Sequence, residues 1–177
     1  KQDYGCAVIV AAARKMQQGE SPSPDGAFLD AMGAIIADKN LDPQYKAVLL
    51  ALPNEDYAAS QMDVEDPPAL YKAKRWVQRS VAQRYETELR ALYDSLRENG
   101  PYVPDAAGMG RRSLKNGALA YLASLETAAS TRLVKAAFDG ADNMTDRMAA
   151  LNYLSMLDAP ERKDALGAFY ARFKNDH

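Results

Sequence analysis

The sequence predicts an all-α fold built from packed helix hairpins, and three observations support this. Apolar residues recur at spacings of three and four along nearly the whole chain, which is typical of amphipathic helices. Residues that begin and end helices separate these segments, whereas no segment alternates apolar and polar residues over the length of a strand. Apolar residues make up 47% of the 177 residues, which is enough for a sizeable core.

The first predicted helix covers residues 3–18 and is apolar nearly all round in its middle, so it is expected to be buried. Gly19 follows it and suits a left-handed stop. Cys6, the single cysteine, is expected to be a small core residue and not a nucleophile, because reactive thiols need nearby cations or helix N-termini. One cysteine forms no internal disulfide, which indicates a reducing compartment, most simply the cytoplasm.

Three further helices are predicted to begin where a capping residue precedes proline, at Ser23-Pro24, Asp42-Pro43 and Asp66-Pro67. Pro53 is expected to end the second of them. The third is predicted as one long helix near residues 67–98, stopped by Asn99-Gly100-Pro101. At ~1.5 Å per residue, this helix would be a rod of roughly 45 Å.

Residues 105–177 are predicted to form two stacked helix hairpins. Asp105 and Asn143 are expected to cap the first helix of each hairpin. Breaks between helices are expected at residues 127–130, at Asp139-Gly140 and at Ala159-Pro160.

An internal repeat supports the stacking of these hairpins. The segments ALAYLASLE and ALNYLSMLD begin 32 residues apart, at Ala118 and Ala150, and are identical at five of nine positions. That offset is typical of helical solenoids, in which each hairpin buries its inner face on the next. We therefore expect an irregular superhelical (HEAT/armadillo-like) array.

The last predicted helix carries four apolar residues that would need another layer to cover them: Leu166, Phe169, Tyr170 and Phe173. We therefore expect exposed apolar surface there, with possible self-association through the last hairpin. Since the chain also starts at Lys1 and not at Met, we interpret residues 1–177 as a single helical domain or part-domain of a longer chain. Its parts would be residues 1–100 and 105–177.

The stretch ADNMTDRMAAL, residues 141–151, places four oxygen-bearing side chains close together. A calcium loop is excluded by spacing, because Met144 and Arg147 stand where the EF-hand pattern requires a ligand and glycine. The glycosylation tripeptide that starts at Asn143 is common by chance, and nothing indicates secretion. We interpret the stretch as a helix start, with Asn143 as N-cap and Asp146 completing a capping box.

Residue counts exclude several functional classes. The net charge of −2 gives no basic surplus for nucleic acid or an anionic membrane, and no apolar run is long enough to span a bilayer. The only histidine is His177, which removes most zinc chemistry and every His-dependent triad. We assign no catalytic, cofactor-binding or metal-binding residue. Arg111, Arg112 and Arg147 could face an internal space, be paired or be solvated, and exposure to solvent is the default expectation.

Several segments together resemble the C-terminal helical domain of bacterial aminopeptidase N, the alanyl aminopeptidase type of zinc metallopeptidase. They are Leu52-Pro53, Asp66-Pro67, Thr87-Glu88-Leu89, Arg111-Arg112-Ser113-Leu114-Lys115-Asn116, Ala118-Leu119-Ala120-Tyr121-Leu122 and Asn143-Met144-Thr145-Asp146. Each motif alone has low specificity, but their order and spacing along residues 8–177 are fairly specific.

The resemblance implies a parent hydrolase that removes N-terminal residues from peptides, using zinc held by an H-E-x-x-H-x18-E site. Neither that motif nor the substrate-amine motif G-x-M-E-N occurs in this chain. The resemblance therefore implies a non-catalytic part with no cofactor of its own. Its expected partners are the parent's catalytic domain and the peptides that move through the chamber beside it.

A stand-alone helical-repeat scaffold for protein–protein interaction is the alternative interpretation. The 32-residue offset and the expected apolar end face motivate it. The two interpretations predict different reading frames for the encoding gene. A reading frame that extends upstream through H-E-x-x-H favours the aminopeptidase part, and one that begins near Lys1 favours the scaffold.

Overall fold

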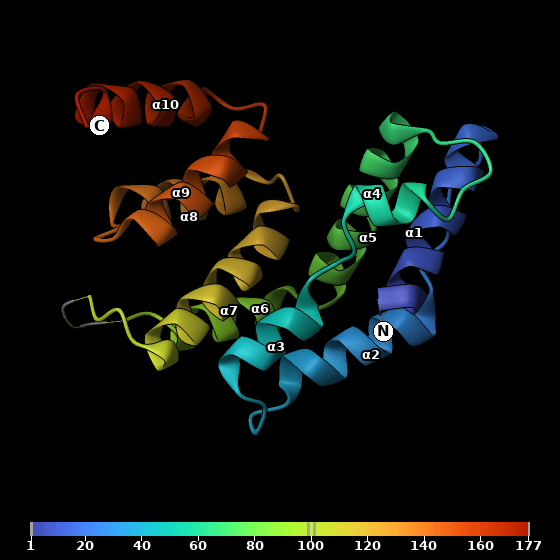
Figure 1. Cartoon of the computed structure of the whole chain (residues 1–177), viewed down its shortest axis with the longest axis horizontal. Helices are drawn as coiled ribbons and strands as arrows, with labels where there is room; N and C mark the ends of the chain where they lie inside the picture. The colour runs from blue at the N-terminus through green and yellow to red at the C-terminus, as the bar shows by residue number, and fades with distance from the viewer. Residues whose placement is uncertain (1, 99, 101, 177) are drawn as a thin grey trace.

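A computed structural model describes residues 2–98, 100 and 102–176, and within these residues the chain forms ten α-helices and no strand (Figure 1). The all-α prediction is therefore confirmed. No helix in this part is long and apolar enough to cross a bilayer. The helices are α1 (Gln2–Gln17), α2 (Gly26–Ala37), α3 (Pro43–Leu50), α4 (Glu55–Ala59), α5 (Pro67–Arg84), α6 (Glu86–Ser95), α7 (Ala106–Ala123), α8 (Ala128–Asp139), α9 (Met144–Ser155) and α10 (Pro160–Phe173).

The helices are arranged as two arms joined at a base (Figure 1). One arm consists of α1, α4 and α5, which pack against one another. The other arm consists of α7, α8, α9 and α10, in which α9 packs on α7 and α8, and α10 covers α9. At the base, α2 and α3 connect the arms, since α2 packs on α5 and α3 packs on α7.

Side-chain caps define most helix starts, as the sequence predicted. Asp42 Oδ1 accepts a hydrogen bond from the backbone N–H of Tyr45 at 3.0 Å, and Asp66 and Asp105 cap α5 and α7 in the same way. The predicted start at Ser23-Pro24 is wrong, because α2 begins two residues later. Asp25 is its N-cap, and Asp25 also accepts a hydrogen bond from the Tyr4 hydroxyl at 2.7 Å, which ties α2 to α1. The short helix α4 was not predicted.

The predicted long helix near residues 67–98 is also wrong, because it breaks at Tyr85 into α5 and α6. Tyr85 has φ −125° and ψ 31°, outside the helical region. The Tyr85 ring lies where a Cβ on Gly33 of α2 would be. Position 33 therefore accepts only glycine unless the ring moves. On either side of the break, α5 packs mainly on α1 and α6 packs mainly on α7. The predicted stop at Asn99-Gly100-Pro101 lies partly outside the described residues.

The two repeat segments occupy equivalent places in successive layers of the second arm. Their shared alanine and first two shared leucines are buried in both copies, whereas the last shared leucine is buried in the second copy, as Leu157, and half-buried in the first, as Leu125. Tyr121 of α7 donates its hydroxyl to the Leu50 carbonyl of α3 at 2.6 Å, and Tyr153 of α9 donates to the Asn116 carbonyl of α7 at 3.0 Å. Burial raises the pKa of Tyr153 to about 12 and raises that of Tyr121 as well. Each tyrosine therefore bonds to a backbone carbonyl of the layer before it, and the predicted stacking is confirmed.

The last helix, α10, covers α9 with one face and leaves the other open. Ala165 is buried, whereas Leu166 is 45% exposed and Tyr170 is 69% exposed. Phe169 and Phe173 are half-buried, with ring centroids 4.7 Å apart. The expected exposed apolar surface is therefore present at Leu166 and Tyr170, while the two phenylalanines are partly covered.

Close packing of α7 on α3 gives a stability prediction. A Cβ on Gly110 would lie 3.1 Å from the backbone nitrogen of Gln44, whereas a Cβ on Gly117 of the same helix would meet open space among the described residues. We expect Gly110→Leu to lower the free energy of unfolding by about 2 kcal/mol through overpacking. Gly117→Leu should leave it unchanged or raise it by up to about 1 kcal/mol, because glycine is a poor helix former. Urea denaturation measures both variants, and equal effects would contradict the close approach.

Candidate functional site

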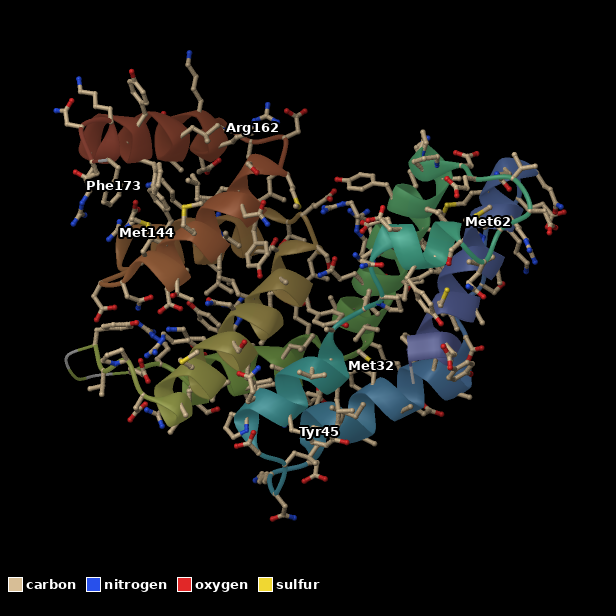
Figure 2. All side chains as sticks on the ribbon, in the orientation of Figure 1. Met32, Tyr45, Met62, Met144, Arg162 and Phe173 are labelled. Atoms are coloured by element: carbon tan, nitrogen blue, oxygen red, sulfur yellow. The ribbon has the colours of Figure 1, made fainter. Side chains whose placement is uncertain are left out.

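The space between the two arms contains a groove of about 800 Å³. It is lined by α3 and α5 on one side, and by α7, α9 and the segment before α7 on the other. Figure 2 shows side chains that extend from both arms into this space. The groove is a consequence of the fold, because α3, α7 and α9 pack in succession and all contribute to its lining.

Apolar and uncharged polar side chains dominate the groove. Val48 and Met109 are exposed apolar residues in its lining, and Gln44 and Gln78 supply amides. Its two charged lining residues, Lys74 and Arg112, are both paired with acidic side chains, Lys74 with Glu55 at 2.9 Å. The groove therefore suits an uncharged chain segment, because both of its charged lining residues are engaged in ion pairs.

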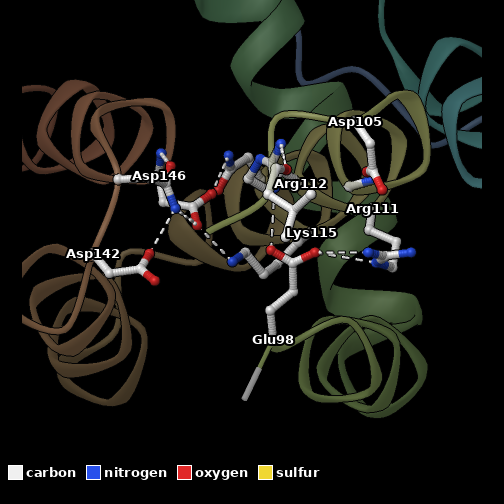
Figure 3. Close-up of polar contacts among 11 residues, drawn as sticks. Glu98, Asp105, Arg111, Arg112, Lys115, Asp142 and Asp146 are labelled. Atoms are coloured by element: carbon white, nitrogen blue, oxygen red, sulfur yellow. Dashed lines mark hydrogen bonds and ion pairs between the residues drawn. The ribbon is translucent and has the colours of Figure 1, made fainter. Parts of the chain in front are cut away.

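Arg112 is 2% exposed, so the prediction that it faces solvent is wrong. Its guanidinium bonds to Glu98 and to the Val103 carbonyl, both at 3.2 Å, and lies 4.6 Å from the centre of the Tyr102 ring. Arg111 is half-buried and pairs with the same Glu98 carboxylate at 3.1 Å (Figure 3). These contacts hold the segment before α7 against the helix, which is a structural role.

Arg147 is also buried, at 9% exposure, which corrects the same prediction. It donates hydrogen bonds to the carbonyl oxygens of Phe138 and Ala141 and lies over the Phe138 ring. These carbonyls belong to the last turn of α8 and to the turn after it. Arg147 therefore closes the turn between α8 and α9. Sequence spacing gave no signal for this, because the partners are backbone atoms.

The stretch that begins at Asn143 is a helix start, as predicted, but Asp146 acts differently. Asn143 Oδ1 accepts a hydrogen bond from the Asp146 N–H at 2.9 Å and so caps α9. The predicted capping box does not describe Asp146, whose carboxylate accepts from Lys115 at 2.7 Å and from the side-chain amides of Asn116 and Asn143, each at 2.9 Å (Figure 3). Asp146 thus connects α9 to α7.

Burial of Asp146 alone would raise its pKa, but the hydrogen bonds from Lys115, Asn143 and Asn116 outweigh this and lower it. The carboxylate is therefore charged at neutral pH. Every buried side-chain nitrogen or oxygen in the described residues has a hydrogen-bond partner. Among these buried polar groups, Asp146 and Asn116 connect two helices. Others bond within their own helix or cap, namely Ser80, Ser124 and Ser130.

The remaining sequence candidates also have structural roles. Cys6 is buried, as predicted, and burial raises its thiol pKa, with a smaller contribution from the nearby Asp3 carboxylate. Asp66, from the acidic stretch before α5, caps that helix and accepts a hydrogen bond from Gln17 at 2.9 Å. Across residues 2–98, 100 and 102–176, no group of three or more His, Cys, Asp or Glu side chains is placed to hold a metal ion.

A family model described as "Domain of unknown function (DUF3458_C) ARM repeats" matches residues 1–177. Two relatives are called aminopeptidase N. The protein from Caulobacter vibrioides is 31% identical over 149 residues, which is 84% of this chain and 17% of that protein. The protein from Escherichia coli is 33% identical over 150 residues, which is 85% of this chain and 17% of that protein. The chain thus spans about a sixth of these curated relatives.

One solved structure shares the fold. The crystal structure of Legionella pneumophila aminopeptidase A in complex with aspartic acid matches with a TM-score of 0.79. The match covers 98% of this chain and 21% of that one, at 22% sequence identity. At this identity the similarity concerns the arrangement of helices alone.

The buried Asp146 carboxylate gives a pH-dependent prediction. Because its folded-state pKa lies below the ordinary value of 3.8, its stabilising effect is present above that value and is lost as pH falls through the folded-state pKa. We expect Asp146→Asn to lower the free energy of unfolding by about 3 kcal/mol at neutral pH, since Lys115 loses its partner. The difference from the wild type should shrink below the ordinary pKa.

The control is Asp139→Asn, which removes an exposed pair with Lys135 within α8. It should cost no more than about 0.5 kcal/mol at either pH. Urea denaturation at neutral and acidic pH measures both variants. A pH-independent loss in Asp146→Asn would contradict the assigned role of the charge.

Proposed function

The chain belongs to the DUF3458_C ARM-repeat family, and from this membership we propose that it is a non-catalytic helical part of an aminopeptidase. The observation that carries the proposal is the partial match. Two proteins called aminopeptidase N align with most of this chain over only 17% of their own length. Such a chain is expected to contribute to a larger enzyme whose reacting groups lie elsewhere. We further propose that residues 1–177 form one helical domain or part-domain, with residues 1–100 and 105–177 as its halves.

The chain's own donors do not fit a zinc site. Its one cysteine is buried with a raised thiol pKa, and its only histidine is the last residue, His177. Catalytic zinc is usually held by three side chains drawn from His, Glu and Cys. We propose that the metal of the parent aminopeptidase is held outside these 177 residues, and no step of the reaction is assigned to this chain.

In this proposal the groove between the arms forms part of the wall along which peptides reach the active site. The lining of the groove supports this role, because Val48 and Met109 offer apolar contact and Gln44 and Gln78 offer amide hydrogen bonds. Such a surface contacts many peptides without selecting for charge.

The parent's catalytic domain is the proposed partner of this chain, and the cytoplasm is the proposed compartment, which the single unpaired cysteine supports.

A stand-alone scaffold that binds other proteins is the second candidate, and the exposed face of α10 favours it. Leu166 and Tyr170 form an apolar surface that a second copy or another protein would cover. The encoding reading frame decides between the two. An upstream extension through H-E-x-x-H supports the aminopeptidase part, and a frame that begins near Lys1 supports the scaffold.

The first prediction concerns the chain on its own. We expect the pure 177-residue chain to show no turnover of an aminoacyl chromogenic substrate, with or without added zinc, because it lacks the groups that hold the metal. A continuous absorbance assay, with a full-length relative as positive control, measures this. Turnover that co-purifies with the chain through two chromatographic steps would overturn the proposal.

The second prediction concerns the groove within the full-length parent. Gly117 lines the groove and a side chain there meets open space, whereas Gly167 of α10 is equally free but lies outside the groove lining. We expect Gly117→Phe to lower kcat/KM for peptides about tenfold, a factor worth about 1.4 kcal/mol. Small aminoacyl chromogenic substrates should be affected less, because they do not reach along the wall.

Gly167→Phe is the matched control, since it adds the same ring to a helical glycine. It should leave kcat/KM for both substrates close to the wild-type values. Equal losses in the two variants, or a loss for small substrates as large as for peptides, would contradict the assignment of the groove to the peptide path.

A further inference from the structure

Three charged residues connect the two arms beside the groove. Arg75 and Arg79 lie one turn apart on α5, in the first arm. Both guanidiniums bind the carboxylate of Glu126, which belongs to the turn after α7, in the second arm. Arg79 Nη2 lies 2.6 Å from Glu126 Oε2, while Arg75 binds Oε1 of the same carboxylate. We refer to Arg75, Arg79 and Glu126 as the clasp.

The turn that carries Glu126 has an unusual backbone. Glu126 has φ +54°, and it is the only non-glycine residue with positive φ in the described part of the chain. A left-handed residue of this kind costs about 1–2 kcal/mol relative to ordinary backbone. Arg79 Nε also donates a hydrogen bond to the Ser124 carbonyl at 2.7 Å, just before this residue. The side-chain and backbone contacts together hold the turn against α5.

The clasp extends to the next layer of the second arm. Arg75 Nη1 lies 3.7 Å from the sulfur of Met156, which follows α9. Among the described residues, α5 packs directly against α7, whereas no helix packing is found between α5 and α8 or α9. Arg75 and Arg79 therefore connect α5 to the turn after α7, and Arg75 also reaches the residue that follows α9.

The clasp lies beside a smaller cavity of about 190 Å³ that adjoins the groove. Arg75, Ser124 and Met156 line this cavity. Four further residues line both the cavity and the groove, namely Lys74, Gln78, Ala120 and Tyr153. The two spaces are therefore neighbours, and the clasp bridges the arms at this end of the groove.

We propose that the clasp sets the width of the groove at this end, with Glu126 as the positioning residue. The inference rests on the chain's own geometry and goes beyond the proposed function, so it stands whether or not the groove borders a peptide path. When the clasp is closed, the outer ends of α5 and α9 are held at a fixed separation. When its charges are removed or screened, that separation varies.

The clasp is expected to fix geometry without adding much stability. The side chains of Arg75, Arg79 and Glu126 are 19%, 38% and 40% exposed, so water and salt screen their attraction. Exposed ion pairs contribute about 0–1 kcal/mol to folding. Burial alone would raise the pKa of Glu126, but the two guanidiniums lower it, so the carboxylate is charged at neutral pH. Removal of the charge should thus alter the arm separation while leaving the fold intact.

Distance measurement between two spin labels tests the proposal. The labels are placed at Gln61→Cys after α4 and at Asn152→Cys on α9, both exposed, in a chain that carries Cys6→Ala. At low salt we expect one narrow distance distribution. Glu126→Gln, which keeps the shape and removes the charge, should broaden the distribution and shift its mean to a longer distance. In 1 M NaCl the distance distribution of the chain with the unaltered clasp should broaden to a similar extent. The distribution of Glu126→Gln should not change further when salt is added.

Two controls make the result specific. Asp139→Asn removes an ion pair confined to α8 and should leave the distribution narrow. The charge-swapped chain with Arg75→Glu, Arg79→Glu and Glu126→Arg should recover part of the narrow population. If circular dichroism shows that Glu126→Gln does not fold, the salt titration of the chain with the unaltered clasp tests the proposal instead. The proposal is overturned if the distribution stays the same in 1 M NaCl, or if Asp139→Asn broadens it as much as Glu126→Gln.

Discussion

The hydrogen bond between the Tyr121 hydroxyl and the Leu50 carbonyl fixes how α7 lies on α3, and the rest of the second arm is built on α7. A buried hydroxyl without a partner is costly, so this bond holds the two helices in one register. The next layer repeats the device, because Tyr153 bonds back to Asn116 of α7. The two tyrosines occupy equivalent positions of the 32-residue repeat, and their bonds connect α3, α7 and α9, which all line the groove.

Three buried charged residues of the second arm connect its helices and turns. Asp146 joins α9 to α7, Arg147 closes the turn after α8, and Arg112 holds the segment before α7. Each is desolvated and fully partnered, and a group in that state is poorly suited to exchange protons with a substrate. In the proposed function, the groove is the surface through which this chain contributes to the parent enzyme, and the proposed role of the clasp is to set the width of one end of the groove.

Local signals allowed the sequence to predict most helix starts, because a capping side chain and the helix it caps are neighbours in the chain. Asp42, Asp66, Asp105 and Asn143 all cap as predicted. The break at Tyr85 was missed because its cause is distant: the ring lies over Gly33 of α2. The burial of the arginines was missed because their partners are mostly backbone carbonyls from other turns. The groove likewise depends on how the arms are placed, which no local pattern encodes.

We propose that this chain forms a wall beside the path of peptides in a larger aminopeptidase. Incorporation of the photo-reactive residue benzoyl-phenylalanine at Gly117 or at Gly167 in the full-length parent tests this role. Both glycines leave open space for the added ring, but only Gly117 lines the groove. Illumination with a slowly cleaved peptide should crosslink peptide from position 117 and not from position 167. Crosslinks from both positions, or from 167 alone, would contradict the account.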